Sequence, residues 1–235
     1  MGGDQIAGGV LAALKRPTDL ARPARPTLIA ESRSLLEELA LTALHTWQRL
    51  AESRGRGRGT VDVAVLFTDL VGFSDWALES GDDLAVELLS QFGAAIEPPI
   101  RDRRGSVVKW LGDGVMAVFP DAPDAVEAAF EARERAAEIS IDSFRAQLKT
   151  GVHLGRPRKV GSDYLGIDVN IAARLLEAAR PGEILISDPT LHALDAGAVT
   201  ASRRPFSAMG VPKGLTAHSV ERRAEGVEVG GSVAP

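Results

Sequence analysis

The amino-acid sequence predicts an α+β fold with a ferredoxin-like βαββαβ core, extended by a C-terminal helix and hairpin. The main observation is the order of the periodic segments, which run strand, helix, hairpin, helix, strand between residues 63 and 187. The second is size: 235 residues, 45% of them hydrophobic, suffice for one substantial core plus extensions.

The first expected strand, residues 63–69, is a continuous apolar run that ends at Asp69, shortly before a glycine turn at Gly72. Such a run, rich in β-branched residues, is typical of a buried central strand. An ionised carboxylate at the edge of a core is costly unless a cation meets it, and a bound metal does this most strongly. The alternative is that Asp69 caps the following turn.

A hairpin expected over residues 106–119 carries a second carboxylate. Its two strands are joined by the tight turn Gly112-Asp113-Gly114, which exposes Asp113 at the tip. If the hairpin pairs beside the first strand, Asp69 and Asp113 converge at one end of the sheet. Two carboxylates without a thiolate or imidazole suit Mg²⁺ or Mn²⁺.

The other elements of the main domain are predicted from periodicity and from helix breakers. Residues 82–97 form a helical stripe that Pro98 and Pro99 are expected to end. The remaining expected elements are a helix over 124–138, a strand over 147–155, a basic loop over 156–159, a helix over 168–179 and a strand over 183–187.

The flanking segments divide the chain into four parts. Residues 1–26 lack periodicity and predict a disordered leader, and residues 222–235 predict a disordered tail. Residues 27–59 combine a helix bearing the stripe of a short coiled coil with an Arg-Gly linker. This stripe either packs on the main domain, residues 60–221, or pairs two protomers.

Composition restricts the partners and the compartment. The net charge of −5 and the pI near 5.5 argue against a nucleic-acid binder. The chain has no cysteine, which gives no sign of secretion, and its apolar stretch at residues 6–14 is too short to span a bilayer. We therefore expect a cytoplasmic protein that does not insert into membranes.

Three polar side chains stand out on expected secondary structure. Lys109 shares strand parity with Val107 and Leu111, so it should face the core and need a partner, or extend along the sheet edge to water. Asn170 and Arg174 are four residues apart and should share one helix face, where they either act on a ligand or bond to solvent. The four histidines show no metal-ligand spacing and receive no role.

Three sequence blocks resemble the signature motifs of class III nucleotidyl cyclases, in the same order and across residues 60–221. They are Phe67-Thr68-Asp69-Leu70-Val71-Gly72-Phe73-Ser74, Lys109-Trp110-Leu111-Gly112-Asp113-Gly114-Val115-Met116-Ala117-Val118-Phe119, and Gly166-Ile167-Asp168-Val169-Asn170-Ile171-Ala172-Ala173-Arg174. The chain is most similar to actinobacterial, mycobacterial-type adenylyl cyclases. The resemblance implies the class III cyclase fold and the conversion of ATP to 3′,5′-cyclic AMP and pyrophosphate.

The resemblance also implies how the base is recognised. Lys109 would donate to adenine N1, and Asp163 would accept from the exocyclic amine. Guanine presents the opposite pattern at these atoms, so the pair favours ATP over GTP. Asp163 fits this role by its distance from Gly166, whereas Asp168 is expected to be the N-cap of the following helix.

The remaining family roles concern the phosphates and the metals. Asp69 and Asp113 would hold two divalent ions, Mg²⁺ or Mn²⁺, while Asn170 orients the ribose and Arg174 stabilises the transition state. In the family these two sets come from different subunits, so the resemblance implies a head-to-tail homodimer with composite sites.

The phosphate contacts depart from the family pattern. The backbone at Leu70, Val71, Gly72 and Phe73 is expected to face phosphate. The triphosphate lysine of the family is replaced by Met209, and Lys213, Arg203 or Arg204 could substitute.

Two alternatives stay open. One is a guanylyl cyclase. The other is a catalytically silent, nucleotide-sensing dimerisation module, against which the full set of matched polar residues argues.

Overall fold

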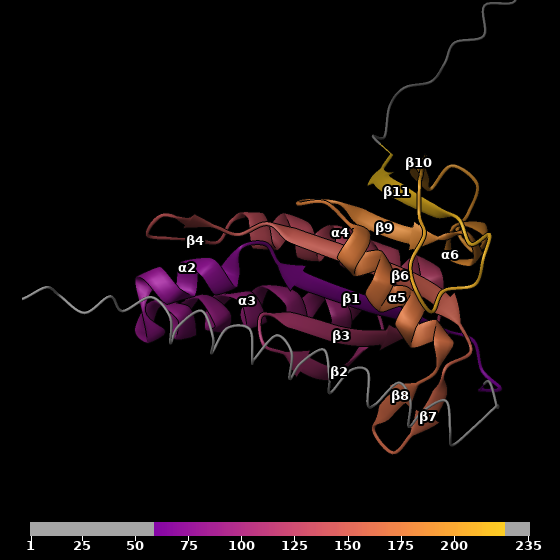
Figure 1. Ribbon diagram of the computed structural model, residues 1–235, viewed down its shortest axis with the longest axis horizontal. Helices are drawn as coiled ribbons and strands as arrows, with labels where there is room; N and C mark the ends of the chain where they lie inside the picture. Colours follow the sequence, from indigo (N-terminus) through magenta and orange to yellow (C-terminus); the bar gives the residue numbers. More distant parts are fainter. Residues whose placement is uncertain (1–58, 224–235) are drawn as a thin grey trace, which may run out of the picture. The chain divides into compact units, whose positions relative to one another are not determined.

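The computed structural model describes residues 59–223, and the expectations for residues 1–58 and 224–235 lie outside this range. A seven-stranded mixed sheet forms its centre, in the order β10-β11-β9-β6-β1-β3-β2 (Figure 1). The strands are β1 (Val63–Leu70), β2 (Ser106–Leu111), β3 (Gly114–Phe119), β6 (Leu148–Gly155), β9 (Ile184–Ser187), β10 (Val199–Arg204) and β11 (Ala217–Arg222). The structure confirms the α+β class, and its elements follow the order along the chain that the sequence predicts for the core.

The first strand is central, as its apolar run predicts. β1 pairs antiparallel with β3 on one side and with β6 on the other, while β6 runs parallel to β9. Successive side chains of β1 enter different apolar clusters: Ala64 and Leu66 contact one face, and Val65 and Phe67 the other. Both faces are therefore buried, which explains why the strand lacks polar alternation.

Helices cover both faces of the sheet (Figure 1). On one face, α3 (Asp82–Asp102) and α4 (Ala122–Ala137) enclose the larger core, and α2 (Phe73–Ser80) precedes them. On the other face, α5 (Ile167–Ala178) packs on β6 and β1. The short helix α6 (Asp188–His192) follows β9, and its Leu191 packs against the larger core. None of the helices within residues 59–223 combines the length and the apolarity that a membrane span requires.

The predicted end of the helix at Pro98 is wrong. α3 continues through Pro98 and Pro99 to Asp102. A proline inside a helix removes a backbone donor and clashes with the carbonyl four residues earlier, at a cost of about 3 kcal/mol or more. Pro99 and Ile100 are both buried, and a buried isoleucine contributes about 1.5–3 kcal/mol, so packing against the core offsets part of this cost.

Several short elements were not predicted. The basic loop expected over 156–159 contains part of a small hairpin, β7 (Arg158–Val160) paired with β8 (Asp163–Leu165), and β4 (Ser140–Ile141) pairs with β5 (Phe144–Arg145). Strands of two or three residues are too short to show a period of two.

A β-bulge in β2 overturns the parity argument for Lys109. The pairing register with β3 shifts between Val107 and Lys109. Val107 packs on the α3 side of the sheet and Val108 on the α5 side, while the Trp110 ring meets Phe92 of α3 edge-on at 5.9 Å. Lys109 therefore lies on the α5 side, opposite to Val107, because the extra residue of a bulge re-aims the side chains that follow.

Candidate active site

Asp69 and Asp113 meet at one end of the central strands. Asp69 is opposite Gly114 of β3 in the sheet register, and the Leu70 amide donates to the Asp113 carbonyl at 3.3 Å. A Cβ atom at Gly114 would lie 2.9 Å from Asp69 Oδ1, so only glycine lets the hairpin come this close. The structure thus places the two carboxylates together, as the sequence predicts.

The electrostatics of this pair are unfavourable without a further cation. Burial, and then the negative charge of Asp69, raise the pKa of Asp113 to about 6, and Lys149 opposes this shift. Lys149 Nζ lies 3.1 Å from Asp69 Oδ2 and supplies part of the missing positive charge.

Lys149 was missed by the sequence analysis. The available signal was a charged residue inside an expected buried strand, between Leu148 and Thr150. Its partner, Asp69, could be identified only from the pairing register of β1 and β6, which places the two residues opposite each other.

The donor chemistry of this end of the sheet fits a hard divalent cation. Asp69 and Asp113 offer carboxylate oxygens, which Mg²⁺ and Mn²⁺ prefer. Within residues 59–223, no group of three or more His, Cys, Asp or Glu side chains could hold a metal ion. The two aspartates could therefore hold ions only if substrate oxygens or water complete the coordination.

Lys109 and Asp163 form a second charged pair. Lys109 Nζ donates to both carboxylate oxygens of Asp163, at 3.0 and 2.8 Å, and each side chain is 32% exposed. The Tyr164 amide also donates to Asp163 Oδ1 at 2.8 Å. Of the two aspartates that the sequence offers beside Gly166, Asp163 is the one that contacts Lys109.

Asp168 is not the helix N-cap, contrary to the sequence prediction. The N-cap of α5 is Gly166, which makes no side-chain capping hydrogen bond. Asp168 is buried and contacts the ring of His153, whose other nitrogen contacts Ser187. A role for His153 was also missed, because nothing in its local sequence signals a partner 15 or 34 residues away.

Asn170 and Arg174 lie on α5, both partly exposed, with Arg174 paired to Glu177 at 2.5 Å. Four residues along a helix turn the direction by about 40°, so the two side chains share a face. The helix thus presents an amide and a guanidinium together, as the sequence predicts.

The expected phosphate loop follows β1. Two of its amides are already used: Leu70 donates to Asp113 and Val71 to Gln147, at 3.3 and 2.9 Å. Gly72 is the N-cap of α2 with a left-handed φ of 74°, and Phe73 begins that helix. Of the four expected residues, Gly72 and Phe73 are therefore the better placed to bind an anion through their amides.

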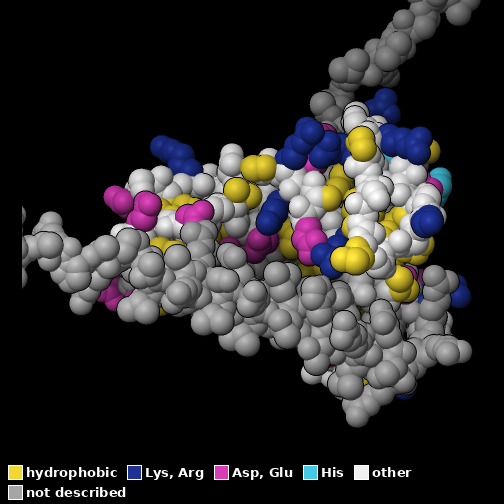
Figure 2. Space-filling model, viewed as in Figure 1, with side chains coloured by type: hydrophobic (Ala, Val, Ile, Leu, Met, Phe, Trp, Pro, Cys, Tyr) yellow, Lys and Arg dark blue, Asp and Glu magenta, His cyan; other side chains and the backbone are white. Residues whose placement is uncertain are grey.

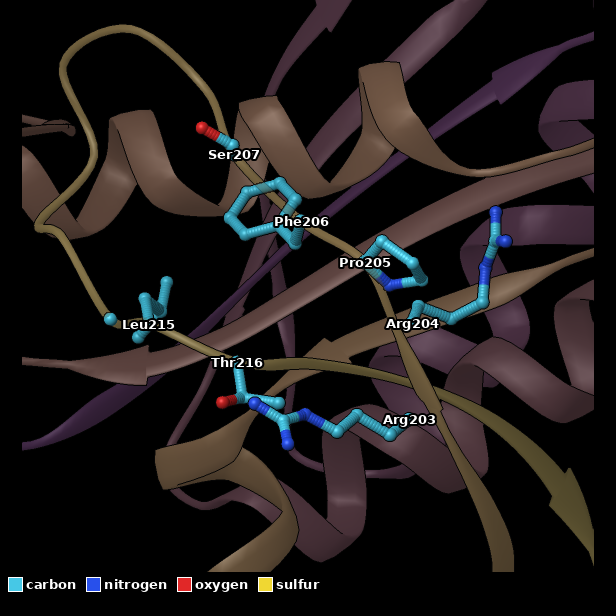
Figure 3. A pocket seen from close by; sticks show the side chains of 8 residues that line it. Arg203, Arg204, Pro205, Phe206, Ser207, Leu215 and Thr216 are labelled. Atoms are coloured by element: carbon cyan, nitrogen blue, oxygen red, sulfur yellow. The ribbon is translucent and has the colours of Figure 1, made fainter.

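The C-terminal hairpin carries the remaining basic candidates. Lys and Arg side chains gather over its strands on the face shown in Figure 2. Arg204 pairs with Glu183 at 2.8 Å, which makes it a poor substitute for the missing lysine. Arg203 extends the other way, toward Thr216, beside a cavity of about 690 Å³ (Figure 3). Met209 is 84% exposed, and Lys213 lies in the same loop.

A comparison with protein families gives a match over residues 58–221 to the adenylate and guanylate cyclase catalytic domain. Among curated relatives, the chain is 36% identical over 128 residues to a putative adenylate cyclase of Rhizobium meliloti, covering 53% of this chain and 22% of that protein. It is 31% identical over 139 residues to a pH-sensitive adenylate cyclase of Mycobacterium tuberculosis (58% and 33%) and 32% identical over 161 residues to an adenylate cyclase of Streptomyces coelicolor (65% and 42%). The matches thus span less than half of each relative.

Solved structures share the fold. The adenylyl cyclase CyaB of P. aeruginosa aligns with a TM-score of 0.60 at 22% identity, over 70% of this chain and 95% of that one. The catalytic core of a rhodopsin-guanylyl cyclase with converted specificity, in complex with ATPalphaS, aligns with a TM-score of 0.64 at 22% identity, over 70% and 97%.

Proposed function

The chain belongs to the family of adenylate and guanylate cyclase catalytic domains, and we propose that it converts ATP to 3′,5′-cyclic AMP and pyrophosphate as a homodimer. One observation carries this proposal. A single hairpin, β2–β3, presents Asp113 at its tip and Lys109 along its edge, and each side chain has a partner from another element, Asp69 or Asp163.

Two divalent ions, Mg²⁺ or Mn²⁺, would be held by Asp69 and Asp113. When bound, such ions lower the pKa of the attacking ribose 3′-hydroxyl and neutralise the triphosphate. The raised pKa of Asp113 supports this assignment, because two close carboxylates favour the arrival of positive charge.

Base recognition falls to Lys109 and Asp163. The ammonium donates and the carboxylate accepts, which matches N1 and N6 of adenine and mismatches guanine. In the free protein the two side chains bond to each other, so adenine must separate them. A partly exposed ion pair contributes about 1 kcal/mol or less, which base binding can offset.

Two side chains of α5, Asn170 and Arg174, act on the sugar and the α-phosphate. Asn170 would orient the ribose, and Arg174 would stabilise the charge that develops as the 3′-oxygen attacks phosphorus. A guanidinium stays charged and matches phosphate oxygens. The present partner of Arg174, Glu177, is exposed and can be exchanged for phosphate at small cost.

The leaving pyrophosphate needs further cations and donors. The amides of Gly72 and Phe73 and the ammonium of Lys149 lie at the carboxylate end of β1, so they are the best candidates. Lys213 could add a contact from the C-terminal loop.

A second copy of the chain would complete each site. β2 is an edge strand that exposes Trp110 (40%) and Leu111 (49%) next to the Asp113 turn, and Ile167 is exposed at the start of α5. Apolar side chains beside polar site residues support a protein partner there. In a head-to-tail dimer, the carboxylates of one chain would face Lys109, Asp163, Asn170 and Arg174 of the other.

Complementation tests the composite site. Asp69→Ala and Arg174→Ala homodimers should each be inactive, whereas their mixture should regain cyclic AMP synthesis, because one intact site forms per mixed dimer. Specific activity of the unaltered chain should fall on dilution. The control is Asp195→Asn, an exposed carboxylate away from the site. Mixtures of folded, dimerising variants that stay inactive would contradict the shared site.

Guanylyl cyclase activity is the second candidate, since the matched family includes both activities. GTP turnover above ATP turnover under the same metal conditions would select it. If purified, dimeric protein binds nucleotide but turns over neither, the silent sensing module is correct.

A further inference from the structure

A buried hydrogen-bond network links α5 to the sheet behind it. His153 of β6 contacts Ser187 Oγ through Nδ1 at 2.7 Å and Asp168 Oδ1 through Nε2 at 3.2 Å. Ser187 Oγ contacts Thr190 Oγ1 at 2.8 Å, and the Leu154 amide donates to Thr190 Oγ1 at 2.8 Å. The side chains of all four residues are buried. A network buried this deeply cannot contact substrate, so its role must be exerted through the elements it joins.

A carboxylate that accepts from His153 favours one direction of hydrogen bonds through the network. In the tautomer with the ring hydrogen on Nε2, His153 donates to the Asp168 carboxylate and accepts at Nδ1 from the Ser187 hydroxyl. Thr190 Oγ1 accepts from the Leu154 amide, and its hydroxyl hydrogen can go to Ser187 Oγ at 2.8 Å or to the Val152 carbonyl at 3.3 Å; in this tautomer it goes to Ser187. Each donor finds an acceptor, and the chain ends on a charge, where hydrogen bonds are strongest.

The start of α5 depends on this network. Gly166, its N-cap, supplies no side-chain acceptor, while Asp168 in the first turn accepts from the Arg156 amide at 3.1 Å as well as from His153. A Cβ atom on Gly155 would lie 2.5 Å from Asp168 Cγ, so β6 and the first turn of α5 are in direct contact. The helix is anchored to the sheet here by the buried carboxylate.

The anchor sets the direction of the side chains proposed to act on substrate. Asp168 lies two residues before Asn170, about 200° around the helix, so one points into the protein when the other points out. A small rotation of α5 would turn Asn170 and Arg174 together. Misplacing such groups by about 1 Å can cost roughly 10²-fold in rate.

We propose that Asp168 is a positioning residue: through His153, Ser187 and Thr190 it fixes the rotation of α5 and thereby aims Asn170 and Arg174 at the ribose and the α-phosphate. This inference rests on the proposed function. The network also contains the N-cap of α6, because Ser187 Oγ accepts from the Thr190 amide at 3.4 Å.

Two variants at one position separate hydrogen bonding from charge. Asp168→Asn can keep the network by reversing it: the amide donates to His153 Nε2, Nδ1 donates to Ser187, Ser187 to Thr190, and Thr190 to the Val152 carbonyl, now 3.3 Å away. Asp168→Ala keeps none of it. We expect kcat to fall about 10- to 100-fold in Asp168→Ala with KM for ATP within about 3-fold, and Asp168→Asn to retain most of kcat.

A core variant supplies the stability control. Phe130→Leu alters a fully buried side chain of α4 and should lower the melting temperature without lowering kcat at a temperature where the protein is folded. If Asp168→Ala lowers only the melting temperature, or if Asp168→Asn loses as much kcat as Asp168→Ala, the positioning role is wrong.

Amide hydrogen exchange tests the anchor independently of catalysis. In the full chain, the first turn of α5, including the Asn170 amide bonded to Gly166, should exchange about tenfold faster or more in Asp168→Ala and near the original rate in Asp168→Asn. Unchanged exchange in Asp168→Ala would overturn the anchor. If the unaltered chain made no cyclic nucleotide, the proposed function would fail while this measurement still decided the anchor.

Thr190→Val tests the direction of the network. In the protein with Asp168, the Ser187 hydroxyl donates to His153 and does not need Thr190 as an acceptor. In Asp168→Asn the hydrogen bonds are reversed and Ser187 must donate to Thr190, so Thr190→Val removes its acceptor. Thr190→Val should therefore speed exchange of α5 more in the Asp168→Asn background than alone. Additive effects of the two substitutions would contradict a directional chain.

Discussion

The β2–β3 hairpin carries two charged pairs that solve opposite electrostatic problems. At its tip, Asp113 meets the like charge of Asp69, and the pKa of Asp113 rises to about 6. Along its edge, Lys109 meets the opposite charge of Asp163 at 2.8 Å. The first pair is poorly satisfied in the free protein, whereas the second is satisfied.

This difference separates two requirements of the proposed reaction. An arriving cation stabilises the carboxylate pair, because a divalent ion offsets the repulsion between the two negative charges. The lysine–aspartate pair is already hydrogen-bonded, so a base binds there only if it replaces the bonds between the two side chains with one bond to each. We therefore expect the first pair to decide whether the reaction proceeds and the second to decide which base is accepted.

The largest predicted effect comes from removing a charge at the hairpin tip. Asp69→Asn and Asp113→Asn keep the side-chain shape but weaken the affinity for a divalent ion, so cyclic AMP formation should fall by about 10²-fold or more with either Mg²⁺ or Mn²⁺. Turnover is measured on the purified protein. Asp195→Asn serves as the matched control and should retain full activity. Turnover near the original rate in either site variant would remove that aspartate from the reaction.

An intermediate effect is expected at the second pair. Lys109→Glu combined with Asp163→Ser reverses the hydrogen-bond pattern offered to the base, so the ratio of kcat/KM for ATP to that for GTP should fall by about tenfold or more. Asp62→Asn, which breaks the exposed ion pair between Asp62 and Arg156, should leave the ratio unchanged. An unaltered ratio in the double variant would exclude the pair from base recognition.

The smallest effect is on stability, and it has a defined sign. Because the folded-state pKa of Asp113 is raised above its unfolded value of 3.8, ionised Asp113 destabilises the fold, fully above pH 6 and progressively less down to about pH 4. In metal-free protein, Asp113→Asn should therefore raise the melting temperature at pH 8. After allowance for partial exposure, the gain is on the order of 1 kcal/mol, or about 2–4 °C.

The stability gained by Asp113→Asn depends on pH and on bound metal. The gain should disappear at pH 4 and shrink when Mg²⁺ or Mn²⁺ is added at pH 8, because the ion stabilises the ionised form. A pH-independent gain would mean that packing, rather than charge, distinguishes the variant.

Much of the fold was predictable because local patterns agree with tertiary contacts. The apolar run of β1 and the Gly112-Asp113-Gly114 turn each encode their own structure, and pairing β1 with β3 brings Asp69 and Asp113 together as expected. The sequence also predicts that Asp163, rather than Asp168, pairs with Lys109. One reason for that choice is wrong, because Asp168 is not the helix N-cap. Parity along β2 fails at the bulge, which depends on how β2 pairs with β3.

The failures share a physical cause. Pro98 and Pro99 break helices in isolation, but α3 continues because Pro99 and Ile100 are buried. Asp168 follows the local rule for an N-cap, yet it turns inward to His153. In each case packing against residues distant in sequence prevails over the local preference of the segment.

The sequence alone determined the class of fold, the central strand and the oxygen-rich pair at its end, because periodicity, glycine turns and carboxylates act over a few residues. Only the tertiary structure decided that Lys149 pairs with Asp69 and that the buried His153 contacts Asp168 in the first turn of α5. These contacts depend on strand register and on the close approach that Gly114 and Gly155 permit. Such features are set by the packing of whole elements, and no short stretch of sequence encodes them.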